Sequence, residues 1–382
     1  MGDVTGPLRG VRIVMMGGLG PGPFCGMLLG DLGADVVRID MPRAVDGELP
    51  IDYTVRRSQR SIALDVKDDW GRTVLLQLID DADAFVEVFR PGVAERLGIG
   101  PDDLLARNPR LVYARMTGYG QDGPYAERAG HDINYIALAG ALHGIGPANA
   151  PVPPLNLVGD YGGGGMLLAV GLLSAIMEAR TSRQGQVVDV SMVDGAATLM
   201  APYWGMVAAG TWRDQRHANV LDGAAHYYGV YETADGEHVA VGAMEPQFYA
   251  ELCQRLDVDV PQDEDDPQAW AAHRAVLATR FRERSRAEWE AQLDSPGCCA
   301  TPVLSLAEAP RHPHNAARGT FIEVDGVVQQ APAPRFSRTV PSTPAGPALP
   351  GDHTREVLTE LGLDDEAVAA LLESGSARQS SR

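Results

Sequence analysis

Lysine is almost absent from the 382-residue sequence, in which Lys67 is the only one. P-loop and Schiff-base enzymes both need a lysine beside their ligand. Lys67 lies among Asp65, Asp68 and Asp69, so it is unsuitable for either role. Acidic residues outnumber basic ones by 51 to 32, and the formal net charge is −19. This charge argues against nucleic acid or an anionic membrane as a partner. Any anionic ligand must therefore be held by a local group of arginines.

The sequence also has few cysteines and no long apolar segment. The four cysteines, Cys25, Cys253, Cys298 and Cys299, show no metal-binding or redox spacing. We therefore expect a cytoplasmic, reducing location. No stretch reaches roughly 18 uninterrupted apolar residues, and the N-terminus lacks a charged start followed by an apolar run, so we expect neither a membrane span nor a leader. His312 and His314 have no third ligand nearby, and we expect surface histidines and no metal site.

The length exceeds one ordinary hydrophobic core and fits two domains. Apolar runs that alternate with helical patterns predict a parallel α/β sheet in the first half. The periodicity fades from 201 to 222, as in a linker. A smaller α+β unit follows, with a hairpin over 228–242 and helices over 246–256 and 270–290. The acidic run at 263–266 is predicted to be a loop or a helix start.

The loop from Gly17 to Pro23 resembles a dinucleotide-binding fingerprint, with Asp40 about 20 residues further on. The match fails because Pro23 stands in place of the third glycine, and prolines lack the N–H groups that hold a pyrophosphate. We therefore expect no nicotinamide cofactor.

Arginines recur near the predicted strand ends. Taken singly, each is more typical of a solvated surface than of a ligand contact. Their recurrence beside the carboxyl ends of parallel strands, where ligands of α/β proteins bind, favours phosphate binding. The group consists of Arg38, Arg43, Arg56, Arg57, Arg60 and Arg90.

The stretch from 130 to 165 carries the most informative chemistry. His131 precedes Asp132, whose carboxylate is predicted to cap the apolar turn that follows. Asp160 precedes four glycines and a helical apolar run from Met166. Glycines allow close backbone approach to a ligand, and a helix start offers unpaired N–H groups. One imidazole and one carboxylate at two helix starts favour proton transfer, with the N–H groups at Asp160 and its glycines as donors to an oxyanion.

Either His131 or Asp160 alone is more typical of a helix cap than of a catalyst. The pair is different, because a four-glycine run would weaken a merely structural helix by roughly 1 kcal/mol per residue. In water their reference pKa values differ by about 2.6, or ~3.5 kcal/mol, which favours the ion pair. Burial penalises the charged pair and narrows this gap, as a reversible enzyme requires.

Five segments resemble the family III CoA-transferase superfamily, and within it the α-methylacyl-CoA racemases. The resemblance runs from about Leu8 to about Leu361 and is most specific at 130–135 and 154–165; the other segments are 185–189, 242–249 and 334–337. It implies a large Rossmann-like domain (1–195 and 322–382), linkers at 196–224 and 309–321, and a small α+β domain at 225–308. It also implies an interlocked homodimer and an acyl-CoA substrate, whose coenzyme A is part of the substrate rather than a separate cofactor.

Carried over by position, the resemblance makes His131 and Asp160 the two catalytic bases, and Glu245 the partner of His131. It places coenzyme A against two segments, which comprise Ala63, Leu64, Asp65 and Val66, and Gly130, Asp132, Ile133, Asn134 and Tyr135. One position departs from the family, because Met41 stands where its relatives usually have arginine. Arg38 or Arg43 would then have to hold the phosphates.

Three functions remain open from the sequence. The first is racemisation of a 2-methylacyl-CoA by 1,1-proton transfer through an enolate. The second is CoA transfer, in which Asp160 is a nucleophile that forms an anhydride and then a thioester. The third is a non-catalytic CoA-binding protein. His131 favours the first, since transferases of this family need only the aspartate.

Overall fold

The computed structural model describes residues 5–47, 53–262 and 268–381, so the acidic run at 263–266 lies outside the described residues. The chain forms two compact units, which are described separately. The first comprises Met1–Ala139, Leu155–Leu199 and Gly319–Arg382, and the second comprises Gly140–Pro154 and Met200–Arg318. Residues 225–308, the small domain expected from the sequence, lie within the second unit.

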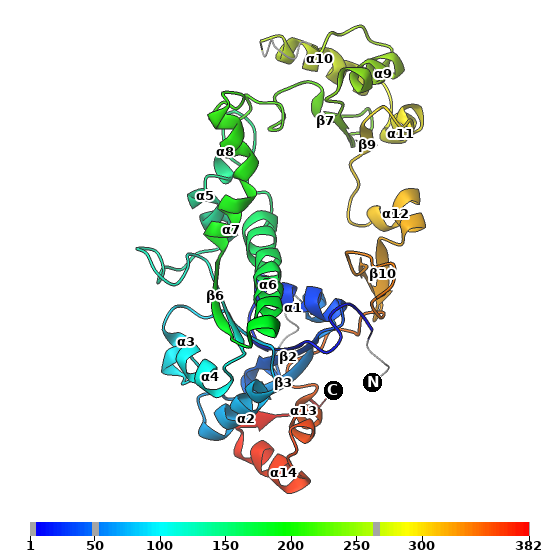
Figure 1. The fold of residues 1–382 in the computed structure, drawn as a ribbon. Helices are drawn as coiled ribbons and strands as arrows, with labels where there is room; N and C mark the ends of the chain where they lie inside the picture. Colours follow the sequence, from blue (N-terminus) through cyan, green and yellow to red (C-terminus); the bar gives the residue numbers. More distant parts are fainter. Residues whose placement is uncertain (1–4, 48–52, 263–267, 382) are drawn as a thin grey trace. The chain divides into compact units, whose positions relative to one another are not determined.

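The first unit is built on a seven-stranded sheet of order β12-β3-β2-β1-β4-β5-β6 (Figure 1). Six strands are parallel, and β12 alone runs antiparallel, beside β3. This confirms the α/β fold class predicted from the sequence. Strands β1 to β5 are almost entirely buried, as expected of parallel strands covered on both faces. The strands are β1 (Arg12–Met16), β2 (Asp35–Asp40), β3 (Arg60–Leu64), β4 (Ala84–Glu87), β5 (Val112–Thr117), β6 (Gln186–Ser191) and β12 (Ala377–Arg378).

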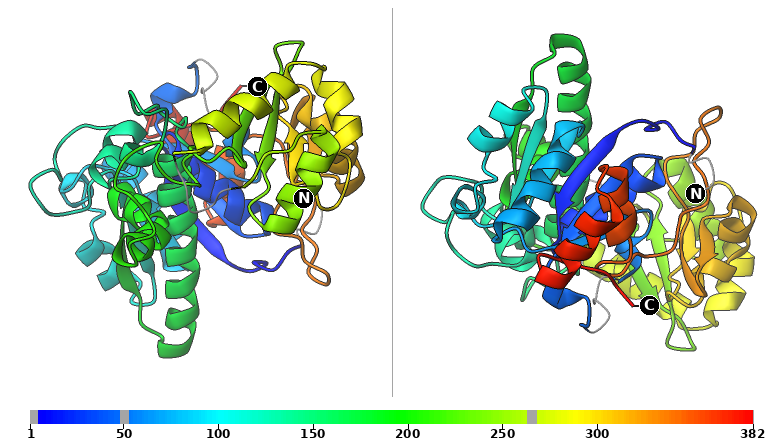
Figure 2. Two further views of the ribbon diagram at one scale, coloured as in Figure 1. Left: turned by 90° about the horizontal axis from the view of Figure 1, so that it is seen from above. Right: turned by 90° about the horizontal axis from the view of Figure 1, so that it is seen from below.

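Helices cover both faces of this sheet. One core contains α1 (Pro21–Asp31) and α6 (Leu167–Ser182), and the other contains α2 (Asp69–Asp80), α4 (Pro101–Arg107), α13 (Thr354–Glu360) and α14 (Asp365–Ser374). Helix α2 begins where the Asp68 carboxylate accepts the N–H groups of Trp70 and Gly71. The C-terminal helices lie beside the N-terminal strands (Figure 2, right), which matches the pairing of β12 with β3.

The glycine-rich stretch continues directly into α6. Residues Leu157–Met166 form a π-helix, η4, so the helix begins nine residues before the Met166 start that the sequence predicted. The continuous helix Leu157–Ser182 is long and apolar enough to cross a membrane by length and composition only. One such helix is weak evidence of a membrane span, because core helices of soluble proteins can have the same length and apolar composition. Its inner residues, including Leu168 and Leu172, are buried in the core of the first unit.

The second unit contains the antiparallel sheet of β7 (Tyr228–Glu232), β8 (His238–Gly242) and β9 (Ala300–Pro302). Helix α9 (Pro246–Leu256) has the predicted bounds. The predicted helix over 270–290 is wrong, because Ser285 starts a new helix with the Glu288 N–H on its hydroxyl. Two helices result, α10 (Trp270–Phe281) and α11 (Arg286–Leu293). The stretch from 201 is also not an irregular linker, since α8 (Ala201–Ala208) forms there.

The chain also contains two short helices and a hairpin. The short α3 (Val93–Arg96) precedes α4, and α12 (Pro313–Arg318) ends the second unit. The hairpin predicted at Asp325-Gly326 is confirmed by β10 (Phe321–Val324) and β11 (Val327–Gln330).

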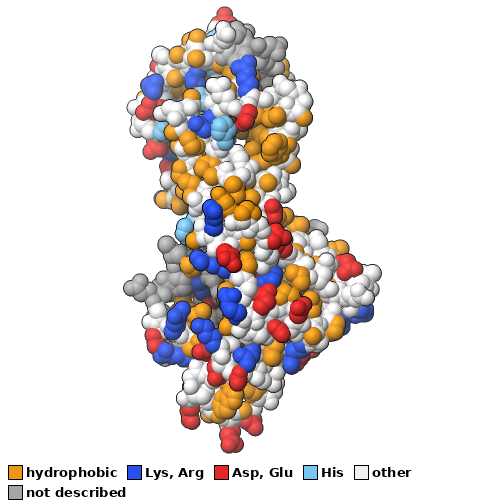
Figure 3. Space-filling view, turned by 90° about the vertical axis from the view of Figure 1, so that its left-hand side faces the viewer, with side chains coloured by type: hydrophobic (Ala, Val, Ile, Leu, Met, Phe, Trp, Pro, Cys, Tyr) orange, Lys and Arg blue, Asp and Glu red, His pale blue; other side chains and the backbone are white. Residues whose placement is uncertain are grey.

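On the face drawn in Figure 3, acidic and basic side chains are interspersed rather than gathered by sign.

Candidate active site

A cavity of about 630 Å³ lies at the carboxyl ends of β1, β4 and β5 in the first unit. The strand order reverses between β1 and β4, because β2 and β3 extend the sheet on one side and β4 to β6 on the other. Ligands of open α/β sheets bind at such a switch point. His131, Tyr135 and Asp160 all line this cavity, so the structure brings the two predicted acid/bases into one site.

His131 precedes the first residue of α5 (Asp132–Leu138) and has extended backbone angles. Its backbone N–H donates to the side-chain oxygen of Asn134 at 3.0 Å, and its carbonyl accepts the N–H of Asn134. Asn134 therefore fixes the backbone of the turn that carries the imidazole. The His131 N–H already occupies the side-chain oxygen of Asn134. The predicted contact of Asn134 with coenzyme A stays a prediction.

Asp160 lies in the first turn of η4 and is half-buried. The side-chain amide of Asn156 donates to its Oδ2 at 3.0 Å. Burial raises the pKa of the Asp160 carboxyl, and the negative charge of Asp132 adds to this rise. The Asn156 hydrogen bond and the charge of His131 oppose it. The net rise brings Asp160 closer to an ordinary imidazole in proton affinity.

The predicted role of Asp132 as the cap of its own helix is wrong, because Asp132 is already the first residue of α5. Its carboxylate turns to η4 instead, where Oδ2 accepts the N–H groups of Gly159 at 2.6 Å and Asp160 at 2.8 Å. Asp132 is 5% exposed, and its contact with coenzyme A stays a prediction. The Asp160 N–H is likewise occupied and is not the oxyanion donor that the sequence predicted.

The glycines after Asp160 serve helix packing. Their N–H groups lie inside a π-helix, whose hydrogen bonds run to carbonyls five residues earlier, so they are not free oxyanion donors. A Cβ on Gly163 would lie 2.7 Å from the Ala196 nitrogen of α7 (Met192–Leu199), and one on Gly165 would lie 2.6 Å from the Phe24 ring of α1. These close approaches explain the glycines without a ligand.

Tyr135 forms the wall of the cavity beside His131. Its hydroxyl donates to the carbonyl of Gly130, and its ring lies 5.0 Å from that of Tyr119 in an edge-on arrangement. A Cβ on Gly130 would come within 2.8 Å of the Tyr135 ring, so glycine is required there. Burial raises the pKa of Tyr135 to about 12, which keeps this donor protonated. Ile133 is exposed on the same helix, and its CoA contact stays a prediction.

Most of the predicted arginine group stabilises the fold. Arg38 is fully buried and donates to Asp40, Gln59 and the Ala348 carbonyl. Arg56 and Arg57 are also buried, paired with Asp40 and Asp31 respectively. Arg60 is paired with Asp35, Glu356 and Glu360. This part of the phosphate prediction is therefore wrong, since these guanidiniums already have carboxylate partners.

Two arginines face the cavity. Arg90 lines it and is exposed, as the sequence-based prediction requires. Arg128 lines it too, with its guanidinium 3.7 Å from the centre of the Tyr125 ring. The sequence analysis missed Arg128, although its position three residues before His131 was the available signal. Arg43 lies outside this lining but is exposed, and has no ion pair within the described ranges.

The predicted CoA segment at 63–66 is largely inside the sheet. Ala63, Leu64 and Val66 are buried, and β12 pairs along Ala63 and Leu64. The N–H of Asp65 donates to the Ser376 carbonyl, and only the Asp65 side chain is exposed. Because the side chains of Ala63, Leu64 and Val66 are buried, the predicted contact of this segment with coenzyme A stays a prediction that other groups of the segment would have to meet.

Glu245 lies in the second unit, at the residue that precedes α9. Its carbonyl accepts the N–H groups of Phe248 and Tyr249, while its side chain is exposed and makes no capping hydrogen bond. The carboxylate is thus unoccupied by its own helix. Its pairing with His131 stays a prediction.

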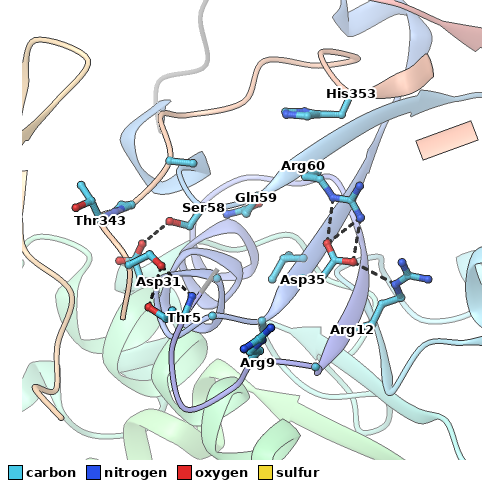
Figure 4. Close-up of a pocket in the computed structure, with 18 of the residues that line it drawn as sticks. Thr5, Arg9, Arg12, Asp31, Asp35, Ser58, Gln59, Arg60, Thr343 and His353 are labelled. Carbon is cyan, nitrogen blue, oxygen red and sulfur yellow. Dashed lines mark hydrogen bonds and ion pairs between the residues drawn. The ribbon is translucent and has the colours of Figure 1, made fainter. Parts of the chain in front are cut away.

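A second cavity, of about 710 Å³, lies at the other end of the strands in the first unit (Figure 4). Its acidic groups are paired within the fold. Asp35 lies between Arg12 and Arg60, and Asp31 accepts the Ser58 hydroxyl and pairs with Arg57. Because it contains neither His131 nor Asp160, this cavity is not the candidate active site.

Within the described ranges, no three His, Cys, Asp or Glu side chains cluster in a way that could hold a metal ion. His312 instead lies 3.2 Å from Glu290.

The chain matches the model of CoA-transferase family III over residues 8–354. It is 44% identical to the α-methylacyl-CoA racemase of Mus musculus, over 95% of this chain and 96% of the mouse protein. It is 30% identical to the succinyl-CoA:glutarate CoA-transferase of Mus musculus, over 99% and 92% of the two chains. Among solved structures, a CaiB/BaiF family protein from Brucella suis has a TM-score of 0.81 at 24% identity, over 94% and 100% of the two chains.

Proposed function

The chain belongs to CoA-transferase family III, and on this premise we propose that it is an isomerase that inverts the α-carbon of 2-methyl-branched acyl-CoA thioesters. Its greater identity to a racemase, 44%, than to a transferase, 30%, supports this choice. The observation that carries it is that His131 and Asp160 line one cavity at the switch point of the sheet.

Inversion requires that a proton leave one face of the α-carbon and that another arrive on the opposite face. The thioester makes this proton acidic, because the resulting carbanion delocalises as an enolate. In the proposed mechanism one of His131 and Asp160 removes the proton, and the other, protonated, returns one to the opposite face. The reverse direction exchanges their roles. The raised pKa of Asp160 suits this exchange, since neither resting protonation state is then a deep trap.

Cationic side chains at the cavity support an acyl-CoA as the substrate. Arg90 and Arg128 line it, and their guanidiniums suit the coenzyme A phosphates despite the net charge of −19. Arg43 and Gly130 are retained as proposed CoA contacts. Arg38 is not, because its guanidinium is buried and paired.

We also propose that the protein is a homodimer. Three apolar side chains are exposed one to three turns apart on the continuous helix of η4 and α6, namely Met166 at the end of η4 and Val170 and Met177 in α6. Such an apolar stripe suits contact with a second copy of the chain. Sedimentation is the measurement, and a stable, active monomer at micromolar concentration would contradict this proposal.

The test of the reaction uses a single enantiomer of a 2-methylacyl-CoA in deuterated water. The wild type is expected to racemise it and to incorporate deuterium at the α-carbon. His131→Ala and Asp160→Ala are each expected to lose racemisation, because neither base alone reaches both faces. Each variant should retain exchange with only one enantiomer, and the preferred enantiomer should differ between them.

The alternative is CoA transfer with Asp160 as the nucleophile. It predicts an acyl group on Asp160 that hydroxylamine intercepts, stimulation by a second carboxylic acid, and little effect of His131→Ala. A hydroxylamine-sensitive adduct mapped to Asp160, without α-proton exchange, would replace the racemase proposal with this one.

A further inference from the structure

The carboxylate of Asp132 connects the two segments that carry the proposed acid/bases. It follows His131 directly in the chain, and its Oδ2 accepts the N–H groups of Gly159 and Asp160 at 2.6 and 2.8 Å. Gly159 permits this approach, since a Cβ there would lie 2.7 Å from the same oxygen. The segment that carries His131 is therefore hydrogen-bonded, through Asp132, to the helical turn that carries Asp160.

These two hydrogen bonds act where the backbone most needs a partner. The first N–H groups of a helix have no acceptor within that helix, and Gly159 and Asp160 lie in the first turn of η4. A charged acceptor forms stronger hydrogen bonds than a neutral one and suits a helix N-terminus. The Asp160 backbone is therefore fixed by a group outside its own helix.

The environment of Asp132 keeps it in this position. The side chain is 5% exposed, and Oδ1 is buried without a hydrogen-bond partner among the described residues. Removing the two N–H bonds would leave the whole carboxylate unpaired in the interior, which is costly. Asp132 and the first turn of η4 therefore hold each other in place.

We propose that Asp132 is a positioning residue that holds Asp160 at the substrate's α-carbon and fixes the position of its carboxyl relative to the His131 imidazole. This inference rests on the proposed function, in which Asp160 is one of two acid/bases. Asp132 also acts through charge, because its carboxylate contributes to the raised pKa of Asp160. The two effects, hydrogen bonding and charge, can be separated by substitution.

The experiment compares Asp132→Asn and Asp132→Ala with the wild type. Asparagine keeps a carbonyl oxygen that accepts both N–H groups but removes the charge, whereas alanine removes both. Asp365→Asn is the matched control, since Asp365 is likewise the first residue of a helix, α14, and is exposed. The carboxyl of Asp160 is titrated by ¹³C NMR, with Asp160→Asn to assign its resonance. Thermal denaturation reports whether each variant folds.

Asp132→Asn is expected to lower the pKa of Asp160, while Asp365→Asn leaves it unchanged. Asp132→Ala is expected to lower kcat about 10- to 100-fold, the scale of a misplaced catalytic group. Its loss of deuterium exchange should be confined to the enantiomer that Asp160 serves, as identified with Asp160→Ala. A merely structural role would reduce exchange from both enantiomers alike.

An Asp160 titration unchanged by Asp132→Asn, together with equal loss of exchange from both enantiomers in Asp132→Ala, would overturn the inference. If Asp132→Ala does not fold, the asparagine variant decides through the NMR titration and the ratio of exchange from the two enantiomers. If the wild type exchanges no α-proton, the proposed function fails. The titration then still decides whether Asp132 tunes Asp160, because it needs no substrate.

Discussion

The Nε of Arg38 lies 2.9 Å from Oδ2 of Asp40, two residues along β2, and both side chains are buried. The other two guanidinium nitrogens donate to Gln59 and to the Ala348 carbonyl, so one side chain connects β2 with segments 21 and 310 residues away. An arginine at a strand end of an α/β protein can thus serve the fold entirely, although its position suggests a ligand contact.

This pair predicts opposite outcomes for two arginines near Met41. Arg38→Ala leaves the buried Asp40 carboxylate short of a partner and should destabilise the protein by about 3–5 kcal/mol. Arg43→Ala should leave stability unchanged and raise KM for acyl-CoA with kcat nearly constant, the pattern of lost uniform binding. Denaturant unfolding and steady-state kinetics measure both. An equal KM in Arg43→Ala and in the exposed control Arg318→Ala would remove Arg43 from the CoA site.

Glu245→Gln is expected to lower kcat while the fold is retained. This expectation rests on the proposed pairing of Glu245 with His131, because a carboxylate fixes the tautomer of an imidazole and favours its protonated form more strongly than an amide does. The measurement is kcat between about pH 6 and 9, a range that includes the reference pKa of histidine, about 6.5. Turnover identical to the wild type throughout this range would exclude Glu245 from the mechanism.

Gly195→Ala should be strongly destabilising, because the added Cβ would lie 1.9 Å from the Gly163 carbonyl oxygen. Neither the Cβ nor the carbonyl oxygen can move without a shift of its backbone. Helices α7 and η4 would have to separate. Gly205→Ala is the control, since Gly205 lies in α8 with no atom within 4 Å of the added Cβ. That variant should gain up to about 1 kcal/mol from helix propensity. Equal melting temperatures for the two variants would refute the packing explanation of these glycines.

The second unit should lose stability on mild acidification because of His226. The pKa of this imidazole is lowered to about 4, mainly by burial and also by the charges of His273 and Arg274. Its Nε2 lies 2.9 Å from the Tyr249 hydroxyl, and the Tyr227 ring packs edge-on against it. Above about pH 6.5 the residue is neutral in both states. Between that pH and about 4, His226 binds a proton mainly in the unfolded state. The free energy of unfolding therefore decreases as the pH is lowered through this range.

The measurement is the melting temperature at pH 7 and at pH 5 for the wild type and His226→Gln. The variant should show a smaller decrease, even if it is less stable at both values. His314→Gln, at an exposed position, should retain the wild-type decrease. The same decrease in all three proteins would rule out His226 as the cause.

Local patterns predicted the sheet and most helices well. The parallel strands are nearly continuous apolar runs, and α9 begins at a proline after an acidic residue, so its bounds were predictable. The π-helix was not, because four glycines have poor helix propensity and predict a loop. Packing against α1 and α7 overrides this propensity, and a single sequence does not reveal those distant partners.

The meeting of His131 and Asp160 in one cavity was also predictable, since each lies in a short, distinctive segment. The functions of their neighbours were not. Asp132 was expected to cap the helix that it begins, and it holds a turn 27 residues later instead. Arg57 likewise contacts Gln329, 272 residues away. Such partners depend on the completed tertiary structure, and the spacing of charges along the chain does not encode them.

Strand β12 is only two residues long, yet it occupies the free edge of β3. An uncovered edge offers unpaired N–H and C=O groups on which strands of other molecules can assemble. Loss of the segment from α14 to β12 would therefore do more than shorten the chain, because it would expose a buried apolar strand to aggregation. We therefore expect solubility after heating to fall when this segment is removed.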